Sequence, residues 1–120
     1  MADQDTPSQA NPVKVVGRYE DGIRPAGVSK SVADGRKVVT TAGTRVQFDA
    51  LDCRSVAFTA DAANVGTVVI GGPTCVAAAG TRQGTPLAAG DTAIFSVWNM
   101  NVLFMDATTS GEGVSYTVLA

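Results

Sequence analysis

The sequence contains no histidine among its 120 residues. Histidine is the usual proton shuttle near neutral pH and the commonest nitrogen ligand for transition metals, so two frequent routes to catalysis are missing. The chain also lacks the spaced oxygen ligands of a calcium loop and the lysine-bearing glycine loop that holds phosphates. The one close carboxylate pair, Asp49 and Asp52, lies in a predicted connection and is interpreted as solvated turn residues. We therefore expect a protein that is not an enzyme and uses no metal and no cofactor.

Cysteine and long apolar runs are also scarce. Cys53 and Cys75 are the only cysteines, and residues 1–5 are polar and acidic, unlike the start of a secretory leader. Secreted disulfide scaffolds of this size usually carry more cysteines, so two buried thiols are favoured over a disulfide. No apolar run approaches the ~18 residues that cross a bilayer, which predicts a soluble chain with no membrane contact.

Charge is low and unevenly spread. The formal net charge is −2, with six basic against five acidic residues in 1–37 and three basic against six acidic residues in 38–120. Neither part has the clustered, unopposed basic residues of a nucleic-acid footprint, which predicts no nucleic-acid partner. The bases between Arg24 and Lys37 either contact an acidic protein surface or keep a flexible segment solvated.

The chain divides into an extended N-terminal arm, 1–37, and a β module, 38–120. Glycine, proline, serine and charge are spread through the arm, whereas the module consists of short apolar runs separated by turns. The predicted runs are 36–41, 44–48, 55–60, 67–70, 74–78, 92–98, 102–105 and 114–118. About seven or eight short strands without a helix predict an antiparallel β-sandwich or jelly roll, and a closed small barrel is the alternative. The nearly continuous apolar run 102–105 predicts burial on both faces, at the centre of the fold or against a second subunit.

The module is small for a self-sufficient core. A domain of roughly 80 residues buries only about 60–65% of its unfolded surface. No lysine follows Lys37, and the module lacks the proline- and lysine-rich edges that discourage strand pairing between chains. Self-association that covers the edges is therefore expected, and a closed symmetric ring would also stabilise the small core.

Candidate contact residues fall into two groups. Tyr19 is an aromatic residue in a poorly apolar stretch and is a reasonable anchor for docking the arm onto another surface. The predicted partner-binding residues of the arm are Val13, Val15, Val16, Tyr19, Ile23, Arg24, Lys30, Arg36 and Lys37. In the module, Trp98 is either a recognition residue or a tryptophan packed at a sheet end, and Met100 is either core filler or part of a subunit interface.

Three segments carry a family resemblance. They are 65–72 (VGTVVIGG), 85–91 (TPLAAGD) and 105–116 (MDATTSGEGVSY). Each is ordinary turn chemistry, but their order and spacing resemble small β-sandwich proteins of tailed bacteriophage virions, in which a GT-x-x-x-GG hairpin, a PL-x-x-G-[DE] turn and a D-A-x-x-x-GEGV-x-Y segment recur. The resemblance covers roughly residues 38–120 and excludes the arm.

The resemblance implies a structural protein of the particle. It is either a capsid decoration or cement protein or a head-fibre or tail accessory component, and no catalytic residue is carried over. The leading hypothesis is a decoration protein on the virion surface, made in the host cytoplasm, whose modules form a homotrimer and whose arm binds neighbouring copies of the major capsid protein. A dimer and a pentamer stay open as alternatives to the trimer. The alternative is a phage module that recognises a host-surface glycan, with Trp98 as the stacking platform.

Overall fold

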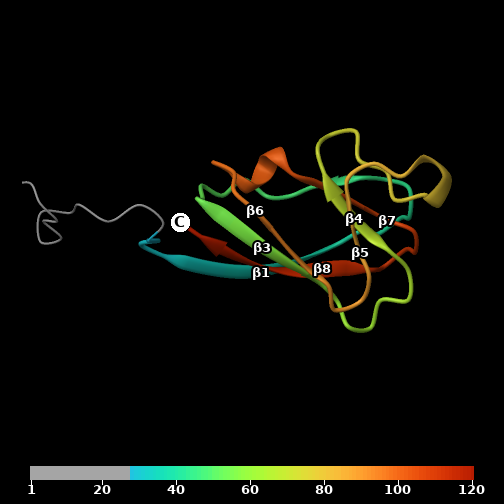
Figure 1. Cartoon of the computed structure of the whole chain (residues 1–120), viewed down its shortest axis with the longest axis horizontal. Coiled ribbons are helices and arrows are strands. Elements are labelled where there is room, and N and C mark those ends of the chain that lie inside the picture. Colours follow the sequence, from blue (N-terminus) through green and yellow to red (C-terminus); the bar gives the residue numbers. More distant parts are fainter. Residues whose placement is uncertain (1–27) are drawn as a thin grey trace, which may run out of the picture.

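The computed structural model describes residues 28–120, which form eight strands in two antiparallel sheets (Figure 1). Sheet A contains, in spatial order, β1 (Val32–Val38), β8 (Gly113–Leu119), β3 (Ser55–Ala60) and β6 (Thr92–Phe95). Sheet B contains β2 (Val46–Gln47), β7 (Phe104–Ala107), β4 (Val68–Gly71) and β5 (Thr85–Leu87). Two short 3₁₀ turns, η3 (Ala79–Thr81) and η4 (Met100–Val102), lie in connections. The predicted all-β antiparallel sandwich is confirmed.

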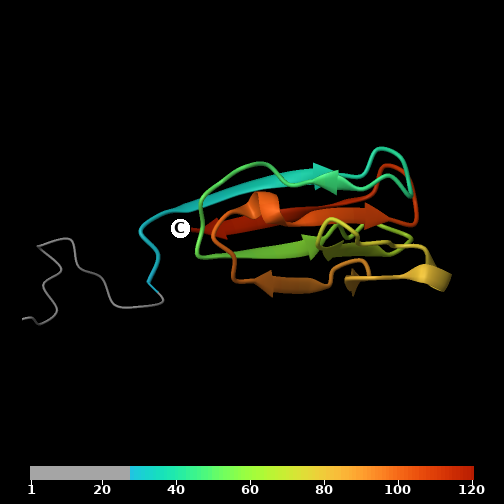
Figure 2. The same ribbon diagram turned by 90° about the horizontal axis from the view of Figure 1, so that it is seen from above.

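The strand pairing follows a nested pattern. β1 pairs with β8, β2 with β7, β3 with β6 and β4 with β5, all antiparallel. These are the pairs of one long hairpin, folded so that alternate pairs fall in opposite sheets. No strand pair in residues 28–120 joins the two sheets, so the alternative closed barrel is not formed. Figure 2 shows the four strands of sheet A side by side, with β1 at one edge and β6 at the other.

The core lies between the sheets and follows the period-two pattern of the strands. In β3, Val56, Phe58 and Ala60 are buried while the residues between them are half-buried. The rings of Phe58 and Phe48 lie 4.7 Å apart between centroids, and Tyr116 packs against both. Strand alternation alone thus predicts which face of sheet A is buried.

Strand β7 is buried on both faces because it lies inside sheet B and is covered from outside by the 72–84 connection. Met105 faces the main core, whereas Phe104 packs against a second cluster formed by Val69, Cys75 and Ala77. The predicted burial of this segment on both faces is confirmed for residues 103–105, and it is satisfied within one chain. Val102, at the start of the predicted run, is exposed in η4.

Several element boundaries differ from the prediction, and three differences change the assignment of a segment. Residues 32–37, assigned to the arm, form most of β1 and pair along their length with β8, so that part of the arm boundary is wrong. Asp34 and Gly35 are typical of a turn, but Gly35 is required in the strand because the Tyr116 ring lies against it. Residues 74–78 make only an isolated bridge, Val76 to Gln83. Strand β5 was missed because it contains Pro86, which is tolerated there at a sheet edge.

Two buried carboxylates fix the loops at the end of the sandwich that holds the 39–45 and 108–112 turns. Asp106 is 2% exposed and accepts hydrogen bonds from the backbone N–H groups of Gly43, Ala77 and Ala107, at 2.8–3.0 Å. Glu112 accepts from the N–H groups of Val65 and Gly66. Both acids are therefore used as acceptors for loop backbone and are explained by the fold.

Candidate functional site

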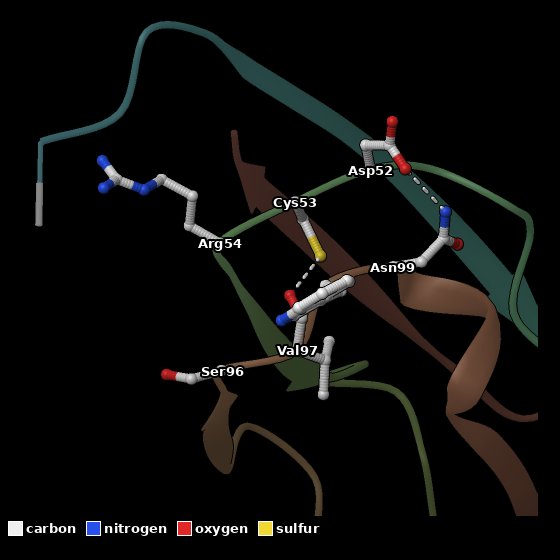
Figure 3. A pocket seen from close by; sticks show the side chains of 7 residues that line it. Asp52, Cys53, Arg54, Ser96, Val97 and Asn99 are labelled. Carbon is white, nitrogen blue, oxygen red and sulfur yellow. Dashed lines mark hydrogen bonds between the residues drawn. The ribbon is translucent and has the colours of Figure 1, made fainter. Parts of the chain in front are cut away.

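An open cleft of about 900 Å³ lies at the end of sheet A where β3 begins and β6 ends (Figure 3). Two segments supply its walls, one leading into β3 and one following β6. The lining residues are Asp52, Cys53, Arg54, Ser96, Val97, Trp98 and Asn99. Its volume falls in the range of small-molecule sites, although its walls come from only two adjacent segments.

The cleft lies where the β3–β6 ladder is interrupted. Ladder pairing runs from Thr59↔Thr92 to Val56↔Phe95, and an isolated bridge, Asp52↔Asn99, continues it in the same register. The three residue pairs between these points lie outside the ladder. In this stretch Cys53 bonds the other segment instead, through its N–H to Trp98 O and through its thiol to Val97 O.

Asn99 fixes the rim of the cleft. Its side-chain oxygen accepts hydrogen bonds from the N–H groups of Leu51 and Asn101, and its Nδ2 donates to Asp52 Oδ1 at 3.0 Å (Figure 3). The next residue, Met100, is fully buried, and its N–H donates to Leu51 O. The backbone on both sides of the rim is thereby anchored to the core.

Trp98 projects from this anchored rim with its residue 90% exposed. Its N-terminal neighbour Val97 packs against the core, and its own carbonyl oxygen accepts a hydrogen bond from Cys53 N at 2.8 Å. The alternative in which Trp98 packs at a sheet end is therefore wrong. Covering a tryptophan removes roughly 150–250 Å² from water, which corresponds to about 4–6 kcal/mol of transfer free energy as an upper bound. A rigidly mounted, uncovered tryptophan is typical of a contact residue.

Other exposed apolar side chains gather at the same end of the sandwich. Strand pairing places Val32 beside Leu119 and Leu119 beside the start of β3, while Leu51 and Val102 flank the Asn99 rim. Six of the eight large exposed hydrophobic residues within 28–120 lie here, and we call this surface the cleft end: Val28, Val32, Leu51, Trp98, Val102 and Leu119. A concentration of exposed apolar residues at one pole of a small domain indicates an interaction surface.

The segment that precedes β1 is tied to the cleft end. Lys30 N and Ser31 N both donate to Ala120 O, and Ala120 N donates back to Ser31 O at 2.9 Å. The guanidinium of Arg54, which lines the cleft, donates to Val28 O. Figure 3 shows the Arg54 side chain directed away from the cleft toward the start of β1. The described part of the chain therefore begins, at Val28, beside Arg54 at the cleft end.

Cys53 does not supply a reactive nucleophile in the cleft. Burial, with a smaller contribution from the adjacent Asp52 carboxylate, raises the pKa of its thiol above the ordinary cysteine value. The thiol also donates to Val97 O at 3.1 Å. Since the thiolate is the nucleophilic form, a neutral, hydrogen-bonded thiol is structural. Cys75 is a second free thiol, buried on the outer side of sheet B in the cluster with Val69 and Phe104.

The structure describes three of the nine arm residues that were predicted to bind a partner. Val13, Val15, Val16, Tyr19, Ile23 and Arg24 lie outside the described residues. Lys30 is exposed beside the cleft end, whereas Arg36 and Lys37 lie on β1 and form ion pairs with Asp61 and Asp49 respectively. Met100 is fully buried in the main core, so its assignment to an interface is wrong; it is the η4 anchor that holds the Trp98 rim.

Sequence reasoning missed most of the cleft end. Asparagine is common in turns, so Asn99 does not stand out in the sequence, and no sequence signal marks Leu51, Val102 and Leu119 as neighbours, because they come from distant parts of the chain. Residues 28–120 contain no group of three or more acidic or cysteine side chains that would hold a metal ion. Nor does this region contain a helix with the length and hydropathy of a membrane span.

No protein-family model, no curated protein and no solved structure matches this chain. The case for a function therefore rests on the geometry of the cleft end and on the family resemblance of segments 65–72, 85–91 and 105–116.

Proposed function

We propose that this chain is a structural virion protein of a tailed bacteriophage, a capsid decoration protein that binds the lattice of the major capsid protein. The cleft end is its contact surface, and residues 1–27 act as an arm that extends the contact to neighbouring subunits. The observation that carries this proposal is the position of Val28, which precedes β1 and follows residues 1–27 in the chain: it is bonded to Arg54 of the cleft, at the end of the sandwich that bears the exposed Trp98 and the other apolar residues. A partner that covers the cleft end would therefore also be within reach of the arm.

The length of the arm fits this role. Twenty-seven residues reach at most about 90 Å when fully extended at ~3.3 Å per residue, which is enough to cross a subunit boundary from the edge of a small sandwich. Val13, Val15, Val16, Tyr19 and Ile23 supply apolar side chains for such a contact. Lys30 is the described basic residue best placed to meet an acidic capsid surface, because Arg36 and Lys37 are already paired.

Trp98 also keeps a second function open, the recognition of a host-surface glycan. An exposed tryptophan at the rim of a polar-lined cleft is a suitable stacking platform for a sugar ring. The polar capacity of the cleft is reduced, however, because Asn99 and Asp52 bond each other and Asn99 also accepts two backbone N–H groups. The two-sheet β fold does not separate the two functions, since virion proteins and lectins both use folds of this class.

Particle binding and glycan binding are measured on the same four proteins: the full chain, a deletion of residues 1–27, Trp98→Ala and Tyr19→Ala. The deletion must end before Val28, because removing 1–37 would also remove most of β1 and confuse loss of the arm with loss of the fold. A decoration protein co-sediments with phage heads, loses binding on deletion or Trp98→Ala, and binds no glycan. Glycan binding that is lost in Trp98→Ala, without head binding, supports the alternative instead. Head binding that survives both changes would overturn the proposed contact surface.

A further inference from the structure

Strand β1 is the longest open edge of the described fold. The four edge strands are β1, β6, β2 and β5, with seven, four, two and three residues. β5 contains a proline, whereas β1 has none. An edge of seven residues presents a row of unpaired backbone groups that favours strand addition unless something covers it. In Figure 2, β1 lies at one side of sheet A, with β8 as its neighbour in the sheet.

The register shows which backbone groups of β1 are free to pair. Ser31 and Ala120 exchange both of their hydrogen bonds, at 3.1 and 2.9 Å, and Val39 N donates to Glu112 O in the same register. In an antiparallel ladder, residues alternate between bonding to one neighbour and facing away from it. Odd-numbered residues of β1 therefore bond to β8. Even-numbered residues direct their N–H and C=O groups to the open edge: Val32, Asp34, Arg36 and Val38.

The residues of β1 are arranged around Gly35 so that the strand can pair with a second copy of itself. Asp34 and Arg36 lie one position to either side of Gly35, and Val32 and Val38 lie three positions to either side. Two such strands, paired antiparallel about a two-fold axis at Gly35, place each Asp34 across from the Arg36 of the other copy. Opposite charges in directly facing positions stabilise a strand pair. Arg36 already pairs with Asp61 of its own chain, and its guanidinium has five donors with which to engage both carboxylates.

The register that places opposite charges across from each other also aligns the free backbone groups of the two strands. A two-fold axis at Gly35 pairs even-numbered residues only with even-numbered residues, and these carry the free backbone groups. Four residue pairs then exchange two hydrogen bonds each, about eight in all. The side chains of Val32, Asp34 and Arg36 are exposed on the outer face, where they are free to meet a partner.

We propose that β1 pairs with β1 of a second copy of this chain, about a two-fold axis through Gly35, to form one continuous eight-stranded sheet. The antiparallel pairing puts the two Val28 residues, and with them the points where residues 1–27 join, at opposite ends of the joined strands. Such a contact is isologous and closes with two copies. It differs from the homotrimer expected from the sequence, and it does not depend on the proposed virion function.

The first test is sedimentation of the full chain over a range of concentrations, with charge variants in β1. Asp34→Arg and Arg36→Asp each place like charges opposite one another in both facing pairs, and the expected result is self-association weaker by about ten-fold or more. The double variant, Asp34→Arg with Arg36→Asp, restores opposite charges and is expected to recover the dimer. Thermal unfolding of each variant confirms that it is folded. Because Arg36→Asp also removes the ion pair to Asp61, Asp34→Arg and the double variant decide the result.

The second test is amide hydrogen exchange of wild-type β1 at high and low protein concentration. The N–H groups of Asp34 and Arg36 should be protected only at high concentration, whereas Gly35 N–H, bonded to β8, should be protected at both. A monomer at all concentrations, a trimer, a dimer that ignores the single variants, or a double variant without recovery would each overturn the proposal.

Discussion

Gly35 and Tyr116 face each other across β1 and β8, and the tyrosine ring occupies the space that a side chain at position 35 would need. A Cβ atom added to Gly35 would lie 2.5 Å from the Tyr116 hydroxyl oxygen. The ring itself is held by edge-on packing against Phe48, with 6.1 Å between ring centroids. A glycine in a strand is thus compensated by an aromatic ring from the next strand, and this contact fixes β1 to the sandwich.

Replacing Gly35 with alanine is expected to destabilise the fold by about 1–3 kcal/mol, because the ring must move out of a packed aromatic cluster. Gly72→Ala is the matched control, since a Cβ there meets nothing within 4 Å. Chemical denaturation of the two variants measures the difference. If both variants unfold at the same denaturant concentration, the ring does not hold β1 in the way described.

Replacing Asp106 with alanine is expected to destabilise the fold by about 3–5 kcal/mol, because three backbone N–H groups lose a shared, buried acceptor. Asp49→Ala is the control: the Asp49 side chain is 70% exposed, and its ion pair with Lys37 should contribute no more than about 1 kcal/mol. Equilibrium unfolding in urea separates the two. Equal and small losses would show that the loops around Asp106 are held by other contacts.

Replacing Trp98 with alanine should leave the free energy of unfolding within about 0.5 kcal/mol of wild type, because the side chain is almost wholly exposed. Phe58→Ala, in the core, is expected to cost about 3–5 kcal/mol. Thermal and urea unfolding provide the comparison. A large stability loss in Trp98→Ala would mean that the indole is packed in the free protein and is not available as a contact surface.

The Cys53 thiol is expected to react slowly with iodoacetamide at neutral pH, and its reaction should accelerate only above the pH at which an unfolded cysteine ionises, about 8.5. A raised pKa means that the folded state holds the proton more tightly than the unfolded state. The stability contributed by the neutral thiol is therefore present below the unfolded pKa and is lost as pH rises through the folded pKa. Asp52→Asn removes a negative charge beside the thiol. The rise in labelling rate and the loss of stability should therefore both occur at lower pH in this variant. Fast labelling at pH 7 would contradict this assignment.

The sequence predicted the strands with regular alternation and failed where tertiary contacts decide. Residues 55–60 and 114–118 alternate clearly, and both segments lie in the strands of the structure. β1 was placed partly in the arm because the Tyr116 ring that compensates Gly35 lies 81 positions away in the chain. The exposure of Trp98 was undecided because Phe95, Val97 and Trp98 are all apolar, so the sequence does not show which of them face the core. Val97 packs against the core, and this contact shows that the neighbouring Trp98 side chain points outward.

The cleft end was even less accessible to sequence reasoning. Its residues come from the segment before β1, the connection into β3, the rim after β6 and the end of β8, and pairing across sheet A brings them together. The two sides of the cleft, 52–54 and 96–99, are more than forty positions apart in the chain. Composition and spacing reveal that Trp98 is unusual, but the surrounding surface depends on the register of the sheet.

The most direct measurement of the proposed function is electron cryomicroscopy of phage heads prepared with and without the purified full chain. Additional density of the size of the sandwich is predicted on the outer capsid lattice, with its cleft end toward the major capsid protein and a connected segment running onto a neighbouring subunit. Deleting residues 1–27 should remove the segment and reduce occupancy. Heads that acquire no density at saturating protein would contradict the account.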